Sequence, residues 1–230
     1  MFLQRMNLKR FLKILLRKDF YTKIQYECLT ETHGNPGASF TICPDKINEN
    51  SVVYSFGIGS DISFDVSIID KYKLNVYAFD PTPRSIDWLK TQKLPDNFSY
   101  FDYGIASFDG EASFFSPQNP DNVSYSMEKN TFVSSDTVEV KVLRLKKIMN
   151  ILGHSKIDVL KMDIEGAEYD VISDIIKSDI EIGQLLVEFH HRLISNGIKK
   201  TKRSIQELNN ANYKIFHVSD TGEELSFMKV

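Results

Sequence analysis

Four side chains close to the ends of two predicted strands have the chemistry to accept a proton. Asp163 and Glu165 follow one apolar run of the chain, and Glu188 and His190 lie at the end of the next. A hydroxyl becomes a good nucleophile when a base takes its proton, and carboxylate and imidazole groups are common bases. Because strand residues alternate between faces, Glu188 and His190 project to the same side, and Glu188 can orient His190 as the base.

The carboxylates of Asp163 and Glu165 are close enough in sequence to repel each other. Either one of them has a raised pKa, or the pair shares a divalent cation, with Glu188 as a third ligand. Mg²⁺ or Ca²⁺ suits such oxygen ligands better than zinc does. The structural alternative is that the pair caps the predicted helix 167–177. The sequence leaves open both the metal ligands and the choice of base among the four residues.

A second group of residues predicts a site for a cofactor that contains ribose. The predicted strand Val52–Phe56 ends at Gly57-Ile58-Gly59, where glycines let the backbone turn tightly and approach a ligand. Asp80 ends the next strand, 23 residues after Gly57, and a carboxylate there can accept two hydrogen bonds from a ribose diol. Asp80 can instead, or in addition, cap the helix that begins near Pro81.

The residues that follow the glycine turn favour S-adenosylmethionine over a dinucleotide. The dinucleotide fingerprint requires a third glycine where this chain has Ile62. Asp61 would also oppose a pyrophosphate at the helix N-terminus with a like charge. S-adenosylmethionine carries a positive sulfonium and a positive ammonium, which a carboxylate attracts. An enzyme that uses NAD or a nucleotide sugar is the alternative.

Strands alternate with helices along residues 51–230, which predicts a parallel sheet with helices on both faces. Right-handed crossovers bring the carboxyl ends of such strands to one edge, where ligands bind. We also expect a hairpin around Asp109-Gly110 and a loop over 116–136 that approaches the donor or acceptor with Ser124, Tyr125 and Ser126. The polar clusters all fall at the expected edge: Gly57–Asp61, Asp80–Thr82, Asp102–Gly104, Asp163–Glu168 and Glu188–His191.

The charge distribution separates the start of the chain from its body. The formal net charge is -3, yet residues 1–20 carry 6 Lys/Arg and 1 Asp/Glu. The remaining body is acidic and therefore a poor nucleic-acid binder. Residues 7–18 predict an amphipathic helix with an apolar stripe and basic neighbours. This helix either packs on the domain with its charges in water or makes peripheral contact with an anionic membrane.

We divide the chain into an N-terminal helix with a linker, residues 1–50, and a catalytic domain, residues 51–230. Cys28 and Cys43 are too few for a disulfide scaffold, and two reduced thiols are expected. Basic residues interrupt the N-terminal apolar stretch, which is not typical of a secretory signal. The expected location is the cytoplasm, with the basic helix at the inner surface of the membrane.

Five stretches resemble the FkbM-type S-adenosylmethionine-dependent methyltransferases, over about residues 52–191. The resemblance implies a Rossmann-like seven-stranded methyltransferase sheet with an antiparallel last strand, and O-methylation of a hydroxyl, often on a sugar or natural product. LKMDIEGAE is the most specific motif and FDPTP the second. The stretches are VVYSFGIGSDISFD, VYAFDPTPRSIDWL, YGIASFDGEASF, IDVLKMDIEGAEYDVI and QLLVEFHH.

The resemblance also assigns donor-binding positions. Gly57 and Gly59 would line the donor, Asp80 would hold its ribose, and Tyr103 with Gly104 would lie beside the adenine. Many methyltransferases have an acidic residue two positions before the first glycine, where this chain has Ser55, and Asp61 is expected to bind the donor's amino group instead. The residues expected to contact the donor are Ser55, Phe56, Gly57, Gly59, Asp61, Asp80, Pro81, Thr82, Tyr103, Gly104 and Asp163.

The sequence therefore predicts an S-adenosylmethionine-dependent O-methyltransferase, with a hydroxyl of a glycan or of a glycosylated small molecule as its acceptor. Polysaccharide biosynthesis is the expected setting. A non-catalytic module that has kept the binding pocket is the alternative of a different class.

Overall fold

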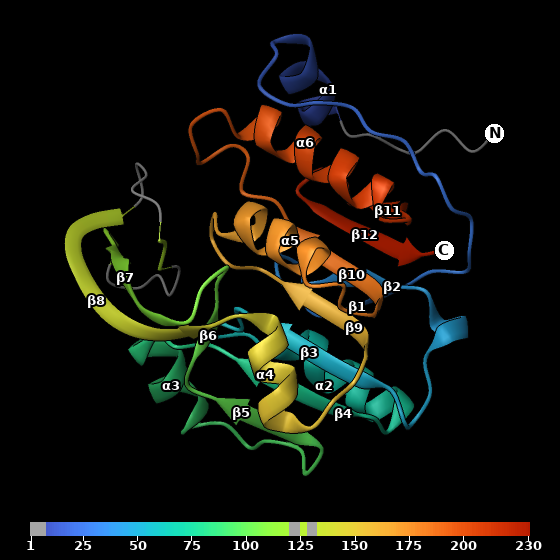
Figure 1. Cartoon of the computed structure of the whole chain (residues 1–230). Coiled ribbons are helices and arrows are strands. Elements are labelled where there is room, and N and C mark those ends of the chain that lie inside the picture. Colours follow the sequence, from blue (N-terminus) through green and yellow to red (C-terminus); the bar gives the residue numbers. More distant parts are fainter. Residues whose placement is uncertain (1–7, 120–124, 128–132) are drawn as a thin grey trace.

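A seven-stranded sheet forms the centre of the molecule (Figure 1). The structure is a computed structural model that describes residues 8–119, 125–127 and 133–230. The strands of the sheet are β3 (Val52–Phe56), β4 (Asn75–Phe79), β5 (Phe98–Phe101), β9 (Ile157–Met162), β10 (Ile182–Glu188), β11 (Tyr213–Val218) and β12 (Glu224–Lys229).

The strand order is β11-β12-β10-β9-β3-β4-β5. The pairs from β10 through β5 are parallel, whereas β12 runs antiparallel to both β10 and β11. The predicted Rossmann-like sheet with an antiparallel last strand is therefore confirmed. The carboxyl ends of β3, β4 and β9 lie next to one another at one edge.

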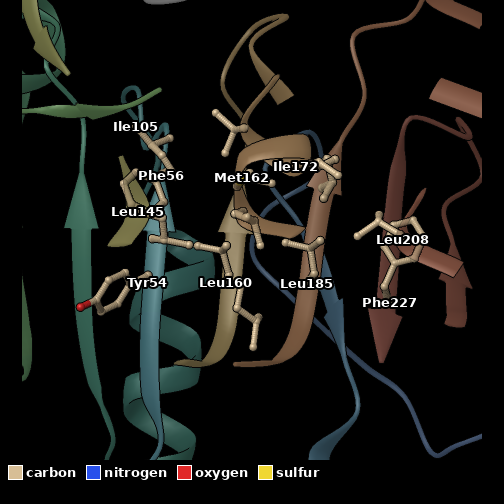
Figure 2. Packing of buried hydrophobic residues seen from close by; sticks show 14 of the residues in the cluster. Tyr54, Phe56, Ile105, Leu145, Leu160, Met162, Ile172, Leu185, Leu208 and Phe227 are labelled. Atoms are coloured by element: carbon tan, nitrogen blue, oxygen red, sulfur yellow. The ribbon is translucent and has the colours of Figure 1, made fainter. Parts of the chain in front are cut away.

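Helices cover both faces of the sheet because its strands present apolar side chains on both sides. Val53 and Val159 pack against one helical layer. Tyr54 and Leu160 pack against the other layer (Figure 2). Each fully buried apolar side chain contributes about 1.5–3 kcal/mol to the free energy of unfolding. One layer contains α2 (Ser63–Tyr72) and α3 (Pro83–Leu89), and the other contains α4 (Leu145–Leu152), α5 (Glu168–Lys177) and α6 (Gly197–Asn210).

The segment predicted as a linker contains a small hairpin. Its strands are β1 (Glu31–His33) and β2 (Phe40–Ile42), and the 3-10 helix η1 (Pro44–Lys46) follows. Cys43 lies between them, and its backbone N–H and C=O both bond to the Gln184 side chain, at 2.7 and 2.9 Å. The hairpin therefore packs on the same face of the sheet as α2 and α3, with Phe40 in that core.

The predicted hairpin around Asp109-Gly110 is wrong. The strands are β6 (Gly104–Ile105), β7 (Gly110–Pro117) and β8 (Val133–Leu143), in the order β6-β8-β7. Gly104 and Gly110 both pair with Val142, from opposite edges of β8. The long strand β8 thus uses both of its edges, and β6 and β7 do not pair with each other.

The N-terminal helix α1 (Leu8–Leu15) presents its apolar side to solvent. Its exposed apolar stripe consists of Leu8, Phe11, Leu12, Leu15 and Leu16, which are 44 to 72% exposed. Arg10 is instead 5% exposed and donates a hydrogen bond to the Ser219 carbonyl. This orientation contradicts the alternative in which the apolar stripe packs on the domain. Across the described residues, the helices are too short or too polar to cross a bilayer.

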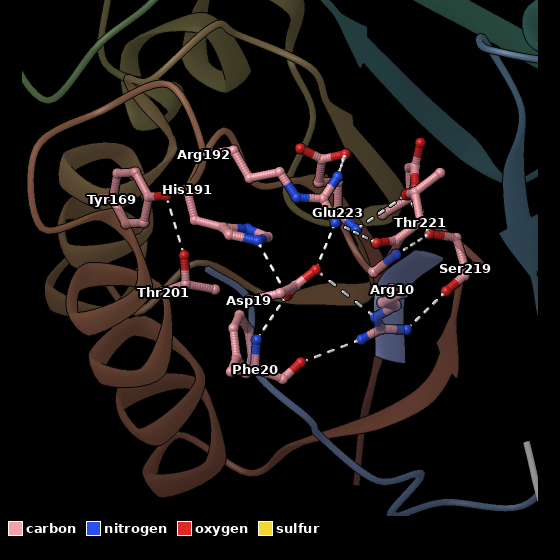
Figure 3. A network of polar contacts seen from close by, with 12 residues as sticks. Arg10, Asp19, Phe20, Tyr169, His191, Arg192, Thr201, Ser219, Thr221 and Glu223 are labelled. Carbon is pink, nitrogen blue, oxygen red and sulfur yellow. Dashed lines mark hydrogen bonds and ion pairs between the residues drawn. The ribbon is translucent and has the colours of Figure 1, made fainter. Parts of the chain in front are cut away.

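Asp19 connects the N-terminal segment to the loop that follows β10 (Figure 3). Its buried carboxylate accepts hydrogen bonds from the Phe20 N–H at 2.7 Å and from Arg192, and His191 Nε2 lies 3.3 Å away. Burial alone would raise the pKa of Asp19, but the contacts with His191 and Arg192 outweigh it and lower this pKa to about 2. The network holds His191 beside His190, the predicted site residue.

Candidate active site

The glycine turn after β3 makes the closest backbone approach at the sheet edge. Gly57 has a φ of +71°, and its N–H bonds to the Phe79 carbonyl at 3.0 Å. A Cβ at Gly57 would lie 1.6 Å from the carbonyl oxygen of Asp163. A side chain therefore cannot fit at this position, and the turn joins the ends of β3, β4 and β9.

Asp80 binds the glycine turn to the start of α3. Its Oδ2 accepts a hydrogen bond from the Gly59 N–H at 3.0 Å. Its Oδ1 accepts from the Thr82 N–H at 3.0 Å and from the Thr82 hydroxyl at 2.6 Å. Thr82 directly precedes α3, so Asp80 organises the entry to this helix. The carboxylate is largely buried and still lines a pocket.

This pocket lies at the predicted edge and collects most of the predicted site residues. Ser55, Tyr103, Glu188 and His190 do not line it. Tyr125, predicted to approach the ligands, lines the pocket, and Ser126 donates to the Glu165 carbonyl at 2.7 Å; Ser124 lies outside the described residues. The predicted residues that line it are Phe56, Gly57, Gly59, Asp61, Asp80, Pro81, Thr82, Gly104, Asp163 and Glu165.

Three carboxylates surround one nitrogen of His190. His190 Nε2 lies 3.6 Å from Asp163, 3.4 Å from Glu165 and 3.9 Å from Glu188. His190 Nδ1 lies 2.7 Å from the Glu168 carboxylate, which is fully buried at the start of α5. We call these five residues the carboxylate–histidine cluster. Because Asp163 and Glu165 line the pocket, His190 stands behind them.

The predicted orienting partner of His190 is therefore corrected from Glu188 to Glu168. Glu168 also accepts a hydrogen bond from the Gly166 N–H at 2.9 Å, which holds it beneath the turn. The sequence did contain a signal for Glu168, because it is the third acidic residue of the motif LKMDIEGAE. The alternation of residues along β10 could not reveal it, because Glu168 comes from a different element.

The protonation of the cluster departs from that of isolated side chains. Burial raises the pKa of Asp163, although Lys161 and His190 lower it in part. Burial and the Asp163 charge raise the pKa of Glu188 to about 9. Burial alone would lower the pKa of His190, but the charges of Glu168 and Glu165 raise it well above its usual value. These surroundings thus favour the protonated form of Glu188 and the imidazolium form of His190.

The cluster also has the donor atoms of a cation site. One ligand atom each from Asp163, Glu165 and His190 lies within 4.8 Å of the others. The sequence pattern suggested Glu188 as the third ligand, but the third residue of this set in the structure is His190. Carboxylate oxygens suit Mg²⁺, whereas imidazole suits transition metals better.

Asp61 and Lys161, both near the glycine turn, make contacts that the sequence did not predict. Asp61 Oδ1 accepts from the Ser63 N–H at 2.7 Å, and its Oδ2 accepts from Asn35 at 3.1 Å, so its carboxylate caps the start of α2. Lys161 had no predicted role, yet it lines the pocket, and its Nζ donates to the Gly57 carbonyl at 2.6 Å. Asp65 on α2 also lines the pocket, although no motif in the sequence pointed to it.

Comparison with known proteins identifies a family of methyltransferases. The family model described as the methyltransferase FkbM domain matches residues 44–215. The human probable methyltransferase-like protein 24 is 29% identical over 202 residues, which are 83% of this chain and 49% of that protein. A hexuronic acid methyltransferase, AglP, of Haloferax volcanii is 24% identical over 148 residues, which are 64% of this chain and 59% of that protein. The chain thus spans about half the length of the curated relatives it matches.

Among solved structures, the methyltransferase FkbM from Methylobacillus flagellatus is similar in fold. The two structures align with a TM-score of 0.49 and 13% sequence identity. The alignment covers 79% of this chain and 44% of that one. The family model, by contrast, covers most of the chain, including β3 through β10 and the carboxylate–histidine cluster. The chain therefore belongs to the FkbM methyltransferase family.

Proposed function

We propose that this protein is an S-adenosylmethionine-dependent O-methyltransferase that acts on a hydroxyl of a glycan or of a glycosylated small molecule. The observation that carries the proposal is one pocket that two chemically different sets of residues line together. Asp80 and the glycine turn are one set, and Asp163 with Glu165 is the other. The first set suits a ribose-bearing donor, and the second suits an acceptor that must lose a proton.

The residues of the pocket fit S-adenosylmethionine better than a dinucleotide. Asp61, Asp65 and Asp80 all line the pocket around the glycine turn. Their negative charges attract a sulfonium and an ammonium but oppose a pyrophosphate. When bound, S-adenosylmethionine supplies an already activated methyl group, so the protein has to align the acceptor oxygen and exclude water.

Asp163 is the proposed proton acceptor. It lines the pocket, and its raised pKa makes it a stronger base than an ordinary carboxylate. His190 is an imidazolium behind it and balances the charges of the cluster, while Glu168 holds the ring in place. Glu188, with a pKa near 9, is already protonated and cannot serve as the base at neutral pH.

A sugar is the proposed acceptor class, and the relative described as a hexuronic acid methyltransferase supports it. The test begins with calorimetric titration of the protein with S-adenosylhomocysteine and with NAD. Transfer of a labelled methyl group is then measured on a panel of free and lipid-linked sugars, including hexuronic acids. Binding of NAD alone would contradict the proposal. Binding of S-adenosylhomocysteine without transfer to any hydroxyl would favour a non-catalytic module.

Asp80→Ala should weaken S-adenosylhomocysteine binding by about 1.5–3 kcal/mol, because charge-assisted hydrogen bonds to a ribose diol are lost. The matched control is Asp87→Ala on α3, where the carboxylate is 75% exposed and pairs with Lys90. Calorimetry measures both affinities, and a urea melt shows whether each variant folds. Equal affinities in the two variants would remove Asp80 from the donor site.

We further propose that α1 makes peripheral contact with an anionic membrane, at the inner surface if the protein is cytoplasmic as its sequence predicts. The exposed apolar stripe can enter the boundary between headgroups and acyl chains, and Lys9, Lys13, Arg17 and Lys18 are exposed beside it. Each basic residue near an anionic surface contributes about 1 kcal/mol. Arg10 anchors the helix to the body of the protein.

Vesicle sedimentation tests this contact. Leu15→Asp/Leu16→Asp should reduce binding to phosphatidylserine-containing vesicles at least about tenfold, because two apolar side chains no longer leave water. The control is Ile151→Asp on α4, where an apolar side chain is 57% exposed outside the stripe. Equal binding by both variants, or equal binding to pure phosphatidylcholine, would contradict the proposal.

A further inference from the structure

Two buried charges of opposite sign line the pocket outside the carboxylate–histidine cluster. Asp65 lies on α2 and is 1% exposed, and Lys161 lies on β9 and is 5% exposed. The Lys161 ammonium donates to the carbonyls of Phe56 and Gly57, at 3.4 and 2.6 Å, and lies over the Phe40 ring. Among the described ion pairs, none of 4.0 Å or less joins Asp65 to Lys161. The side chains of Asp65 and Lys161 therefore line the pocket without forming an ion pair with each other.

Asp65 is an unusual residue to bury at this place. Within the described residues, its Oδ1 and the Oγ of Ser55 are both fully buried and make no hydrogen bond of 3.5 Å or less, so the two groups are neighbours in loose contact only. Burial raises the pKa of Asp65 to about 6, although the Lys161 charge and the neighbouring Ser55 hydroxyl lower it in part. A buried carboxylate oxygen without a partner is costly, which points to a ligand that supplies the missing donor.

Asp61, the residue expected from the sequence to bind the ammonium, has no such unpartnered oxygen. Both of its carboxylate oxygens accept hydrogen bonds from protein groups, the Ser63 N–H and the Asn35 amide. Asp65 lies four residues further along, on α2, and lines the same pocket as the glycine turn. Ser55, which stands where many methyltransferases have the acid, lies beside Asp65.

We propose that Asp65 and Lys161 hold the zwitterionic amino acid end of the methyl donor. Asp65 receives the ammonium group, and Lys161 receives the carboxylate. This inference rests on the proposed function, since it assumes that S-adenosylmethionine occupies the pocket. An ammonium has three N–H donors, and the carbonyls of Phe56 and Gly57 use two of those of Lys161. Many methyltransferases have an acidic residue at the end of β3, and in this protein Asp65 on α2 takes its place.

The test compares two ligands that differ in this end. S-adenosylhomocysteine has the amino acid group, and 5′-methylthioadenosine lacks it but keeps the adenosine. Asp65→Asn, which is nearly isosteric, should lower the affinity for S-adenosylhomocysteine about tenfold or more and leave that for 5′-methylthioadenosine unchanged. Asp70→Asn is the matched control, because Asp70 is an exposed aspartate on the same helix. Calorimetry measures all four affinities.

The outcomes separate this inference from the proposed function. Unchanged affinity of Asp65→Asn for S-adenosylhomocysteine would overturn the inference, and so would an equal loss for both ligands. A larger loss of affinity for S-adenosylhomocysteine in Asp61→Asn than in Asp65→Asn would show that Asp61 binds the ammonium. Failure of the unmodified protein to bind either ligand would instead contradict the proposed donor. Retained binding of 5′-methylthioadenosine shows that the variant is folded.

Discussion

Asp163→Asn is expected to slow methyl transfer at neutral pH by about 10²- to 10⁴-fold, the usual contribution of a general base. Asparagine keeps the shape of the side chain but cannot accept the acceptor's proton. The backbone of Asp163 stays in place, because its N–H bonds to the Phe56 carbonyl at 3.1 Å. Turnover should therefore fall much more than the affinity for S-adenosylhomocysteine. Measuring kcat with a labelled donor, and the affinity by calorimetry, separates the two effects.

Glu188→Gln provides the contrast to this variant. Because the pKa of Glu188 is near 9, its carboxyl is neutral at pH 7 and glutamine replaces it with a similar neutral group. We expect a far smaller loss of turnover than in Asp163→Asn. Activity should also persist in EDTA, since the His190 imidazolium already supplies the positive charge that the carboxylates face. Equal losses in the two variants, or activity that requires added Mg²⁺, would contradict the assignment of the base to Asp163.

The pH dependence of the free energy of unfolding follows from the pKa shifts of these groups. The pKa of Glu188 is raised on folding, so the folded state loses stability as pH rises from the unfolded value near 4.5 through about 9. The pKa of His190 is also raised, and the stability it contributes is likewise lost as pH rises through its folded value. Asp19 behaves in the opposite way, because its stabilisation is lost only as pH falls from about 3.8 through about 2.

Gly57→Ala is expected to lower the free energy of unfolding by more than about 4 kcal/mol and to abolish binding of S-adenosylhomocysteine. A non-glycine residue at a φ of +71° costs about 1–2 kcal/mol by itself. The new Cβ would also lie 1.6 Å from the Asp163 carbonyl oxygen, so β3 and β9 must separate at their carboxyl ends. Urea denaturation measures the first effect, and calorimetry measures the second.

Gly153→Ala is a close control for this substitution. Gly153 ends α4 with a φ of +74°, and a Cβ there would have nothing within 4 Å. The free energy of unfolding of this variant should therefore fall only by the cost of the backbone conformation, about 1–2 kcal/mol. Its affinity for S-adenosylhomocysteine should not change. If both variants lost the same stability, the close approach of Gly57 to Asp163 would have no energetic importance.

The sheet and its functional edge were predictable from local patterns. The glycine turn after Val52–Phe56 and Asp80 after the next strand are local signals, and the structure joins them through the Gly59–Asp80 hydrogen bond. Parallel strands with right-handed crossovers place their carboxyl ends together whatever the side chains are. This geometric rule is why residues more than 100 positions apart, such as Gly57 and Asp163, could be predicted at one edge.

Contacts across elements were not predictable in the same way. Spacing along β10 indicated Glu188 as the partner of His190, but the packing of α5 brings Glu168 to 2.7 Å from it. The order β6-β8-β7 also replaced the expected hairpin, because β8 pairs on both of its edges. The orientation of α1 depends on Arg10 and its contact with Ser219, at the other end of the chain.

The sequence by itself thus determined the fold class and the edge of the sheet at which the candidate site lies, because both follow from periodicity and from glycine and proline positions. Only the tertiary structure decided which acids are buried, paired or without a partner. The roles proposed for Asp65, Asp163 and Glu168 depend on that, since the pKa of a carboxyl and the ligand it accepts are set by the groups packed around it.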